Sequence, residues 1–220
     1  MYRRQVQGGA EILDVNVGHP EIDEKKMMVR VLKAIQSVCD VPLQIDSTKP
    51  EVIEAGLRYY NGKPILNSVN GEEQSLATVL PLVKKYGASV VGLALDENGI
   101  PKTAEGRFEI AKRIVERAEA VGIDRKDVYI DCLTLTVSAE QAACRQTLEA
   151  LHRVKTELGC KTCLGVSNIS FGLPNRELVN RTFLTMAMEQ GLDLPIINPN
   201  VESMTGAVRA FRVLNGIDKN

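Results

Sequence analysis

The stretch ILDVNVG (residues 12–18) sets the pattern of this chain: a short apolar run, then Asp and Asn, then glycine. Four later runs also end in an acid or amide followed by small residues: PLQIDST (42–48), PILNSVNG (64–71), VYIDCL (128–133) and CLGVSNIS (163–170). Such runs are typical of buried parallel strands, and in a βα barrel the functional side chains follow the C-terminal ends of the strands. The side chains expected at one barrel mouth are therefore Asp14, Asn16, Asp46, Asn67, Asp131 and Asn168.

Helix-like segments separate these runs. Pro50 is suited to open one helix and Gly87 to close another. Adding the runs 88–101 and 194–200 gives seven predicted strands, each followed by a helix, with the helices over 21–39, 51–60, 74–87, 105–122, 138–159, 176–191 and 201–216. This alternation predicts a parallel sheet, either doubly wound or closed. No strand end carries G-x-G-x-x-G, and polar residues follow nearly every strand, so a closed barrel is favoured.

Composition narrows the class of protein. A chain of 220 residues, 44% hydrophobic and 25% charged, fits one domain over residues 1–220, because α/β barrels run to ~250 residues as a single unit. A formal net charge of −1 argues against nucleic acid or an anionic membrane as the main partner. No apolar stretch approaches the ~20 residues of a membrane span and no signal segment is seen, so a cytoplasmic protein is expected.

The five cysteines are scattered and odd in number, which speaks against a disulfide framework. Cys160 and Cys163 have C-x-x-C spacing, but they stand at the start of a predicted strand, whereas a redox pair belongs at a strand-to-helix turn. No second pair completes a zinc site, so neither a redox role nor a metal site is expected.

Six segments together carry a resemblance to a known family: QVQGGAEILDVNVG, QIDST, ILNSVNGE, YIDCLTL, GVSNISFGLPNR and LVNRTFLTMAMEQGLD. In this order they resemble the pterin-binding domain of methyltetrahydrofolate:corrinoid methyltransferases, which include the folate domain of cobalamin-dependent methionine synthase and the methyltransferase of a corrinoid iron–sulfur protein. The resemblance covers nearly the whole chain and implies a (βα)8 TIM-type barrel. Because the matched part begins after the first strand of the family, we expect a barrel that lacks this strand, a domain incomplete at its N-terminus and drawn from a longer chain.

The pyrimidine edge of a pterin presents two adjacent donors, an exocyclic amine and a ring N–H, which a carboxylate accepts together. Asp46 and Asp131 are the carboxylate candidates and Asn67 the amide candidate, and the resemblance assigns pterin contacts to the same positions. The alternative for each is a cap of the following helix. Ser47 or Thr48 can replace Asp46 in that role. For Asn16, as for Asp14, substrate contact and bracing of the first loop stand as equal alternatives.

Methyl transfer from N5 of methyltetrahydrofolate to a Co(I) corrinoid leaves charge on N5, and Asn168 is the candidate to donate a hydrogen bond there. The resemblance implies the same role, and the alternative is a turn residue. Four further substrate-binding residues are predicted near late strand ends, with a surface location as the alternative for the arginine: Gly165, Ser167, Arg176 and Ile196.

Two other functions compete with the methyltransferase. Dihydropteroate synthase has a similar set of strand-end acids and amides, but it carries Ser-Arg-Lys where this chain has Ser167-Asn168-Ile169, so the cations for a pyrophosphate leaving group are missing. The other alternative is a non-catalytic folate-binding fragment. The chain has no D-x-H-x-x-G cobalamin pattern, so the corrinoid is expected on a partner protein or domain. A homodimer formed through the open strand edges is a further hypothesis.

Overall fold

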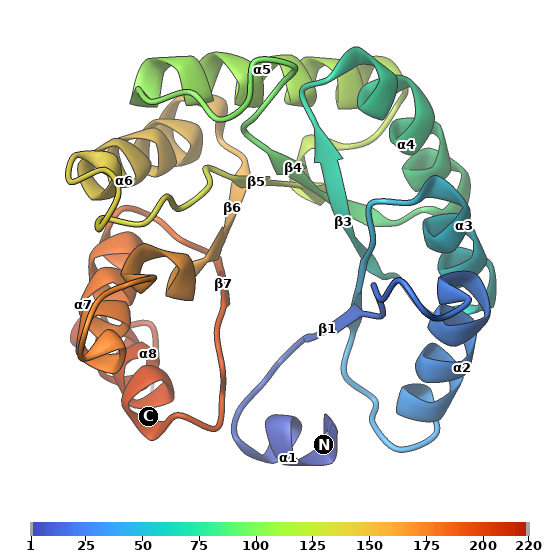
Figure 1. Cartoon of the computed structure of the whole chain (residues 1–220), viewed down its shortest axis with the longest axis horizontal. Helices are drawn as coiled ribbons and strands as arrows, with labels where there is room; N and C mark the ends of the chain where they lie inside the picture. Colours follow the sequence, from blue (N-terminus) through green and yellow to red (C-terminus); the bar gives the residue numbers. More distant parts are fainter. Residues whose placement is uncertain (1, 219–220) are drawn as a thin grey trace.

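Seven parallel strands curl into a ring that helices surround on the outside (Figure 1). The structure, a computed structural model, describes residues 2–218. The strands are hydrogen-bonded in sequence order, each to the next, and are β1 (Leu13–Asn16), β2 (Leu43–Asp46), β3 (Ile65–Asn70), β4 (Ser89–Leu93), β5 (Val128–Asp131), β6 (Lys161–Gly165) and β7 (Leu194–Ile196). β1 and β7 are the two ends of this sheet and face one another across a gap. The predicted TIM barrel lacking one strand is confirmed.

The outer layer follows the predicted alternation. Its helices are α2 (Glu24–Gln36), α3 (Pro50–Tyr59), α4 (Glu73–Tyr86), α5 (Ala104–Ala120), α6 (Ala143–Arg153), α7 (Arg176–Glu189) and α8 (Glu202–Leu214), and α1 (Tyr2–Gln7) precedes β1. Pro50 opens α3 at its first position, as predicted. Gly87 ends α4 in the left-handed conformation with φ of 64°, which favours glycine. None of the helices within residues 2–218 is long and apolar enough to cross a membrane.

One predicted helix starts later than the sequence pattern suggests. The pattern predicts a helix over 138–159, but α6 begins at Ala143 and the turn 154–158 is a π-helix. The hydroxyls of Thr136 and Ser138 each donate a hydrogen bond of 2.7 Å to the carbonyl oxygen of Phe171. These bonds hold the segment against the loop after β6, so it is not free to join the helix.

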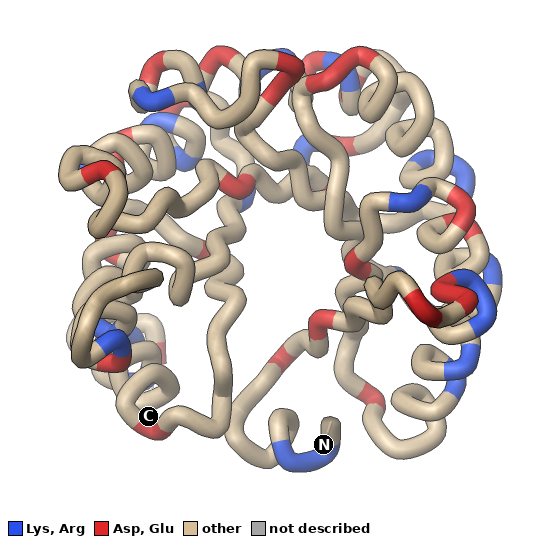
Figure 2. Tube along the Cα trace, viewed as in Figure 1, with Lys and Arg blue, Asp and Glu red and all other residues tan. Residues whose placement is uncertain are grey.

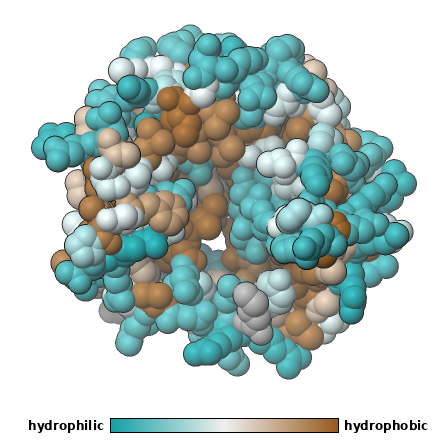
Figure 3. Space-filling model, viewed as in Figure 1, coloured by the Kyte–Doolittle hydropathy of each residue, from teal (hydrophilic) through white to brown (hydrophobic). Residues whose placement is uncertain are grey.

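Alternation along the strands divides the interior into two regions, because successive strand side chains point to opposite faces. Leu13, Val15, Leu43 and Ile45 belong to the main core between ring and helices. Ile65, Val91 and Cys163 form a second, smaller cluster inside the ring, against which Ile12, Leu93, Tyr129, Leu194 and Ile196 pack. Figure 3 shows the ring hollowed at its centre, with apolar surface visible inside it. Figure 2 shows acidic positions on the inner strands as well as on the outer helices.

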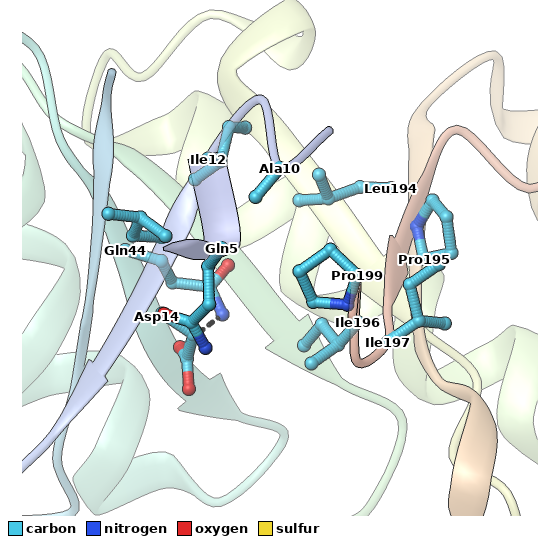
Figure 4. A pocket seen from close by; sticks show the side chains of 11 residues that line it. Gln5, Ala10, Ile12, Asp14, Gln44, Leu194, Pro195, Ile196, Ile197 and Pro199 are labelled. Carbon is cyan, nitrogen blue, oxygen red and sulfur yellow. Dashed lines mark hydrogen bonds between the residues drawn. The ribbon is translucent and has the colours of Figure 1, made fainter. Parts of the chain in front are cut away.

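The gap between β1 and β7 opens a cavity of about 230 Å³ in the side of the ring (Figure 4). Its lining includes Gln5 from α1, Asp14 and Gln44 from the early strands, and Ile196 from β7. The end of α1 packs beside it: a Cβ on Gly8 would stand 2.9 Å from the carbonyl oxygen of Pro199, so only glycine allows this approach. α1 therefore borders the gap without adding a strand to the sheet.

Candidate functional site

Three polar side chains stand side by side on the first three strands, and with Asp14 below them they form what we call the early wall. Asn16 pairs in register with Asp46, and Asp46 with Asn67. Asn16 Nδ2 donates a 3.0 Å hydrogen bond to Asp46 Oδ2. One layer deeper, Gln44 Nε2 donates to Asp14 Oδ1 at 2.7 Å (Figure 4). Amide-to-carboxylate bonds between neighbouring strands thus organise the early wall.

None of the hydrogen bonds at the start of α3 uses Asp46. Ser47 Oγ accepts from the backbone N–H of Lys49 at 3.2 Å, and the Asp46 carboxylate accepts from Asn16. Likewise the turn before α4 uses Asn70, whose Oδ1 accepts from the N–H of Glu72 at 3.0 Å. The starts of α3 and α4 thus use Ser47 and Asn70 as hydrogen-bond acceptors, and neither Asp46 nor Asn67 serves as a helix cap.

Asp131, Gly165 and Asn168 form what we call the late wall, at the ends of β5 and β6. Asp131 Oδ1 accepts a 2.7 Å hydrogen bond from the N–H of Leu133, so this carboxylate also organises its own loop. Asn168 lies in the short 3₁₀ helix Val166–Ser170. Its Nδ2 is 3.3 Å from the point where a Cβ on Gly165 would stand, so the amide lies over the end of β6. A glycine at position 165 leaves room for that amide.

The two walls face the same interior. The thiol of Cys163, inside the ring, has its pKa raised well above normal by burial and then by the negative charges of both Asp131 and Asp14. The cluster inside the ring joins the same early and late strands, because Ile65 of β3 and Cys163 of β6 belong to it and Tyr129 of β5 packs against it. The structure thus brings the candidates of the early and late strands together around one lumen.

Burial shifts the carboxylates toward the protonated form. It raises the pKa of Asp131 to about 6, against hydrogen bonds from the N–H groups of Leu133 and Gly165 and the positive charge of Arg107. Burial also raises the pKa of Asp14 to about 6, against the hydrogen bond from Gln44. For Asp46 burial again raises the pKa, opposed by the hydrogen bond from Asn16. Asp131 is only 7% exposed, whereas Asp46 is half-buried and Asp14 is exposed, so Asp131 is the acid in the most water-poor surroundings, where a polar ligand finds a strong acceptor.

The remaining predicted residues border the late wall or the gap. Arg176 is engaged by its own loop: Nε donates to Ser170 Oγ at 3.0 Å and Nη2 to the carbonyl of Ser167 at 3.1 Å, while the guanidinium lies 4.6 Å from the centre of the Phe171 ring. Arg176 is nonetheless exposed at the start of α7. Ile196 lines the gap.

The C-x-x-C pair has inert surroundings. Cys160 packs in the outer core and Cys163 in the cluster inside the ring, so the two thiols lie in different regions. Burial raises the pKa of Cys160 to about 11, which leaves it protonated at neutral pH. Over residues 2–218, no group of three His, Cys, Asp or Glu side chains is arranged to hold a metal ion.

Two polar residues near the site are absent from the set that the sequence pattern predicts: Gln44 and Arg107. Gln44 is 2% exposed within β2, and an amide in the middle of an apolar run is the signal that marks it. Arg107 is 0% exposed in the first turn of α5. In the sequence of the helix, Arg107 looks like an ordinary surface arginine. The one signal of another role is its place near the helix N-terminus, where a cation is unfavourable.

A barrel with a mouth of carboxylates and amides suits a polar heterocycle, and comparison with known proteins identifies the class. The family model described as pterin binding enzyme matches residues 1–198. The chain is also 31% identical over 221 residues to the methylcorrinoid:tetrahydrofolate methyltransferase of Eubacterium limosum, covering 98% of this chain and 80% of that protein. The chain therefore belongs to the family of pterin-binding enzymes.

A second group of relatives is much longer. The chain is 35% identical over 207 residues to the methionine synthase of Mycobacterium leprae. The aligned region covers 88% of this chain and 17% of that protein. The chain thus corresponds to less than a fifth of the methionine synthases that it matches. Among solved structures, dihydropteroate synthase from Thermus thermophilus superposes with a TM-score of 0.78 at 22% identity, covering 97% of this chain and 87% of that one. This likeness shows a shared fold.

Proposed function

We propose that this protein binds 5-methyltetrahydrofolate in the barrel mouth and passes its N5 methyl group to a Co(I) corrinoid carried by a partner protein or domain. The proposal is supported by the polar side chains at the ends of the early strands and of β5 and β6, which belong to one ring with a shared inner cluster. The names of two groups of relatives, methylcorrinoid:tetrahydrofolate methyltransferase and methionine synthase, support the same chemistry. We propose further that the barrel acts as a single pterin-binding domain of a soluble, cytoplasmic enzyme.

The donors and acceptors of the walls suit the pterin. A carboxylate offers about four lone-pair positions in all, and Asp131 Oδ1 uses one of them for the N–H of Leu133. Asp46 has one oxygen bonded to Asn16. Each carboxylate therefore has acceptor capacity for the amine and ring N–H of a pterin, and Asn67 supplies an amide between them. Asn16, Gly165, Ser167 and Ile196 complete the proposed binding surface.

Asn168 is the proposed catalytic residue. As the N5–methyl bond breaks, its electron pair stays on N5, which must be stabilised and finally take a proton from water. An amide N–H aimed at N5 stabilises the developing charge more than the ground state, which lowers the barrier. The side chain of Asn168 is exposed above Gly165 and therefore accessible to such a ligand. Arg176, fixed beside it, is the proposed contact for the negatively charged tail of the folate.

The test combines a binding and a transfer measurement. Methyltetrahydrofolate is titrated into the chain, and methyl transfer to an added Co(I) corrinoid protein is followed by the absorbance change of the corrinoid. We expect binding and transfer, with Asn168→Ala slowing transfer by about 10²-fold while the Kd changes by less than about threefold. Binding without transfer to any corrinoid would instead favour a folate-binding module. Condensation of pterin pyrophosphate with p-aminobenzoate would favour a synthase.

A further inference from the structure

Arg107 stands in a place that is costly for a cation. It is fully buried, and it lies in the first turn of α5, where the positive end of the helix dipole disfavours positive charge. It donates hydrogen bonds to four neutral oxygens. These are the carbonyls of Pro101 at 2.9 Å, Cys132 at 3.2 Å and Leu133 at 3.0 Å, and Thr147 Oγ1 at 2.7 Å. Its Nη2 makes no hydrogen bond to a described residue. No carboxylate bonded to Arg107 offsets these costs within residues 2–218.

The carbonyls that Arg107 holds include those of the two residues directly after Asp131. Leu133 has φ of 60°, an uncommon conformation for a residue with a side chain. Its carbonyl accepts from Arg107 Nη1 at 3.0 Å. The Thr147 hydroxyl lies 3.1 Å from the same carbonyl and 2.9 Å from that of Ala143, so its single proton is shared between these two acceptors. The N–H of Leu133 donates to Asp131 Oδ1 at 2.7 Å. The buried donors thus bind the backbone in the conformation in which this N–H meets the carboxylate.

We propose that Arg107 is a positioning residue, which acts through the Leu133 backbone to fix the Asp131 carboxylate in its ligand-binding orientation without touching the ligand itself. This inference rests on the proposed function for the identity of the ligand. It explains why a fully buried cation is kept behind a pterin site: the cation makes two otherwise flexible peptide groups rigid, which is the support that a preorganised site needs.

The charge of Arg107 acts in the same direction. It lowers the pKa of Asp131, after the N–H groups of Leu133 and Gly165, and so favours the ionised acceptor. Within residues 2–218, the thiols of Cys132 beside it and of Cys163 on β6 also interact with Asp131. Burial raises the pKa of both thiols, so they are neutral at neutral pH. Arg107 is then the charged group that acts on this carboxyl from behind the wall.

The experiment compares Arg107→Gln, Arg107→Lys and the control Arg117→Gln, each alone and combined with Asp131→Asn. Arg117 lies on the same helix, is half-buried and pairs with Glu73. The first readout needs no ligand: the Asp131 carboxyl carbon is followed by ¹³C NMR while the pH is varied. We expect its titration midpoint to rise by at least about half a pH unit in Arg107→Gln, to recover in part in Arg107→Lys, and to stay unchanged in Arg117→Gln.

The second readout is the Kd of methyltetrahydrofolate at pH 7. We expect Arg107→Gln to weaken binding by about tenfold when Asp131 is present and by less than about twofold in the Asp131→Asn background, because a residue that acts through Asp131 has no effect without it. Equal weakening in both backgrounds, or an unchanged Asp131 titration, would overturn the proposal.

Two further outcomes remain decisive. If the unaltered chain binds no reduced folate, the proposed function fails, while the NMR titration still tests whether Arg107 controls Asp131. If Arg107→Gln does not fold, Thr147→Val removes the second donor to the Leu133 carbonyl. That variant is expected to weaken folate binding by about threefold with Asp131 present and not at all in Asp131→Asn, and an equal loss in both would count against the inference.

Discussion

The two walls of the barrel mouth are built differently. On the early wall, side chains hold side chains: Asn16 bonds Asp46 across neighbouring strands, and Gln44 bonds Asp14. On the late wall the backbone holds the carboxylate, with Asp131 bonded to the N–H of Leu133 and that peptide fixed from behind by Arg107. The early wall includes the edge strand β1, whereas β5 and β6 each lie between two neighbours.

This difference means that the side chains of the early wall can adjust to a changed partner, whereas the carboxylate of the late wall is held in a fixed orientation. An amide side chain can turn to suit a changed partner, because it offers donors and an acceptor on one group. A backbone N–H in a supported loop cannot turn, so the group that it faces must remain an acceptor. Substitutions on the late wall should therefore cost more binding than matched substitutions on the early wall.

The largest expected effect breaks this comparison directly. Asp131→Asn presents an amide to the Leu133 N–H and to the pterin donors, and should weaken methyltetrahydrofolate binding by about 10- to 100-fold. Asp46→Asn, the matched change on the early wall, should cost about 3- to 10-fold, because Asn16 can rotate to pair with it. Calorimetric titration of both variants gives the ratio. Equal losses would mean that the walls do not differ in rigidity.

A second test changes the charge of the late wall without a substitution. Because the pKa of Asp131 is raised to about 6, this carboxyl becomes protonated as the pH falls through 6 and then offers a donor to the pterin in place of an acceptor. We expect the Kd to rise up to about tenfold for each pH unit below 6 and to level off above 7. The dependence should flatten in Asp131→Asn, and an unchanged profile there would assign the effect to another group.

A smaller effect is expected from crowding the amide of Asn168. Gly165→Ala places a Cβ 3.3 Å from Asn168 Nδ2, and φ of −74° at this position suits alanine. The amide must shift by a few tenths of an ångström, so we expect methyl transfer to slow by about 3- to 10-fold with little change in Kd. Single-turnover kinetics separates these terms. A loss of binding without a slower transfer would show that position 165 bears on the ligand itself.

The last test concerns stability in place of binding or transfer. A carboxyl with a raised pKa binds its proton more tightly in the folded state, so stability falls as the pH rises from about 4 to about 6 and the group ionises. For Asp131 this corresponds to on the order of 1–3 kcal/mol. Asp131→Asn should therefore be more stable than the unaltered chain to urea at pH 8, by up to that amount, and equal to it at pH 4. A variant that is less stable at pH 8 would contradict this sign.

The sequence carries enough information for the ring but not for the supports of its site. Strand order and the inward side chains at positions 16, 46 and 67 follow from short apolar runs with polar ends, and Pro50 and Gly87 mark helix ends by their backbone preferences. Arg107 could not be found in this way, because its role depends on carbonyls 25 and 26 residues away in the sequence. Two of the five donors of Arg176 bond its own loop, a contact that no spacing rule encodes.

The gap between β1 and β7 bears on the mechanics of the mouth. In a closed barrel every strand is hydrogen-bonded to a neighbour on both sides, so widening the barrel mouth would stretch hydrogen bonds around the whole sheet. Within residues 2–218 the sheet is open between β1 and β7, so no hydrogen bonds between strands tie these two edges together. The early wall includes the edge strand β1, and the late wall stands on β5 and on β6, which is the neighbour of the other edge strand, β7. A ligand that contacts both the early wall and the late wall would fix the distance between them and so the width of the barrel mouth.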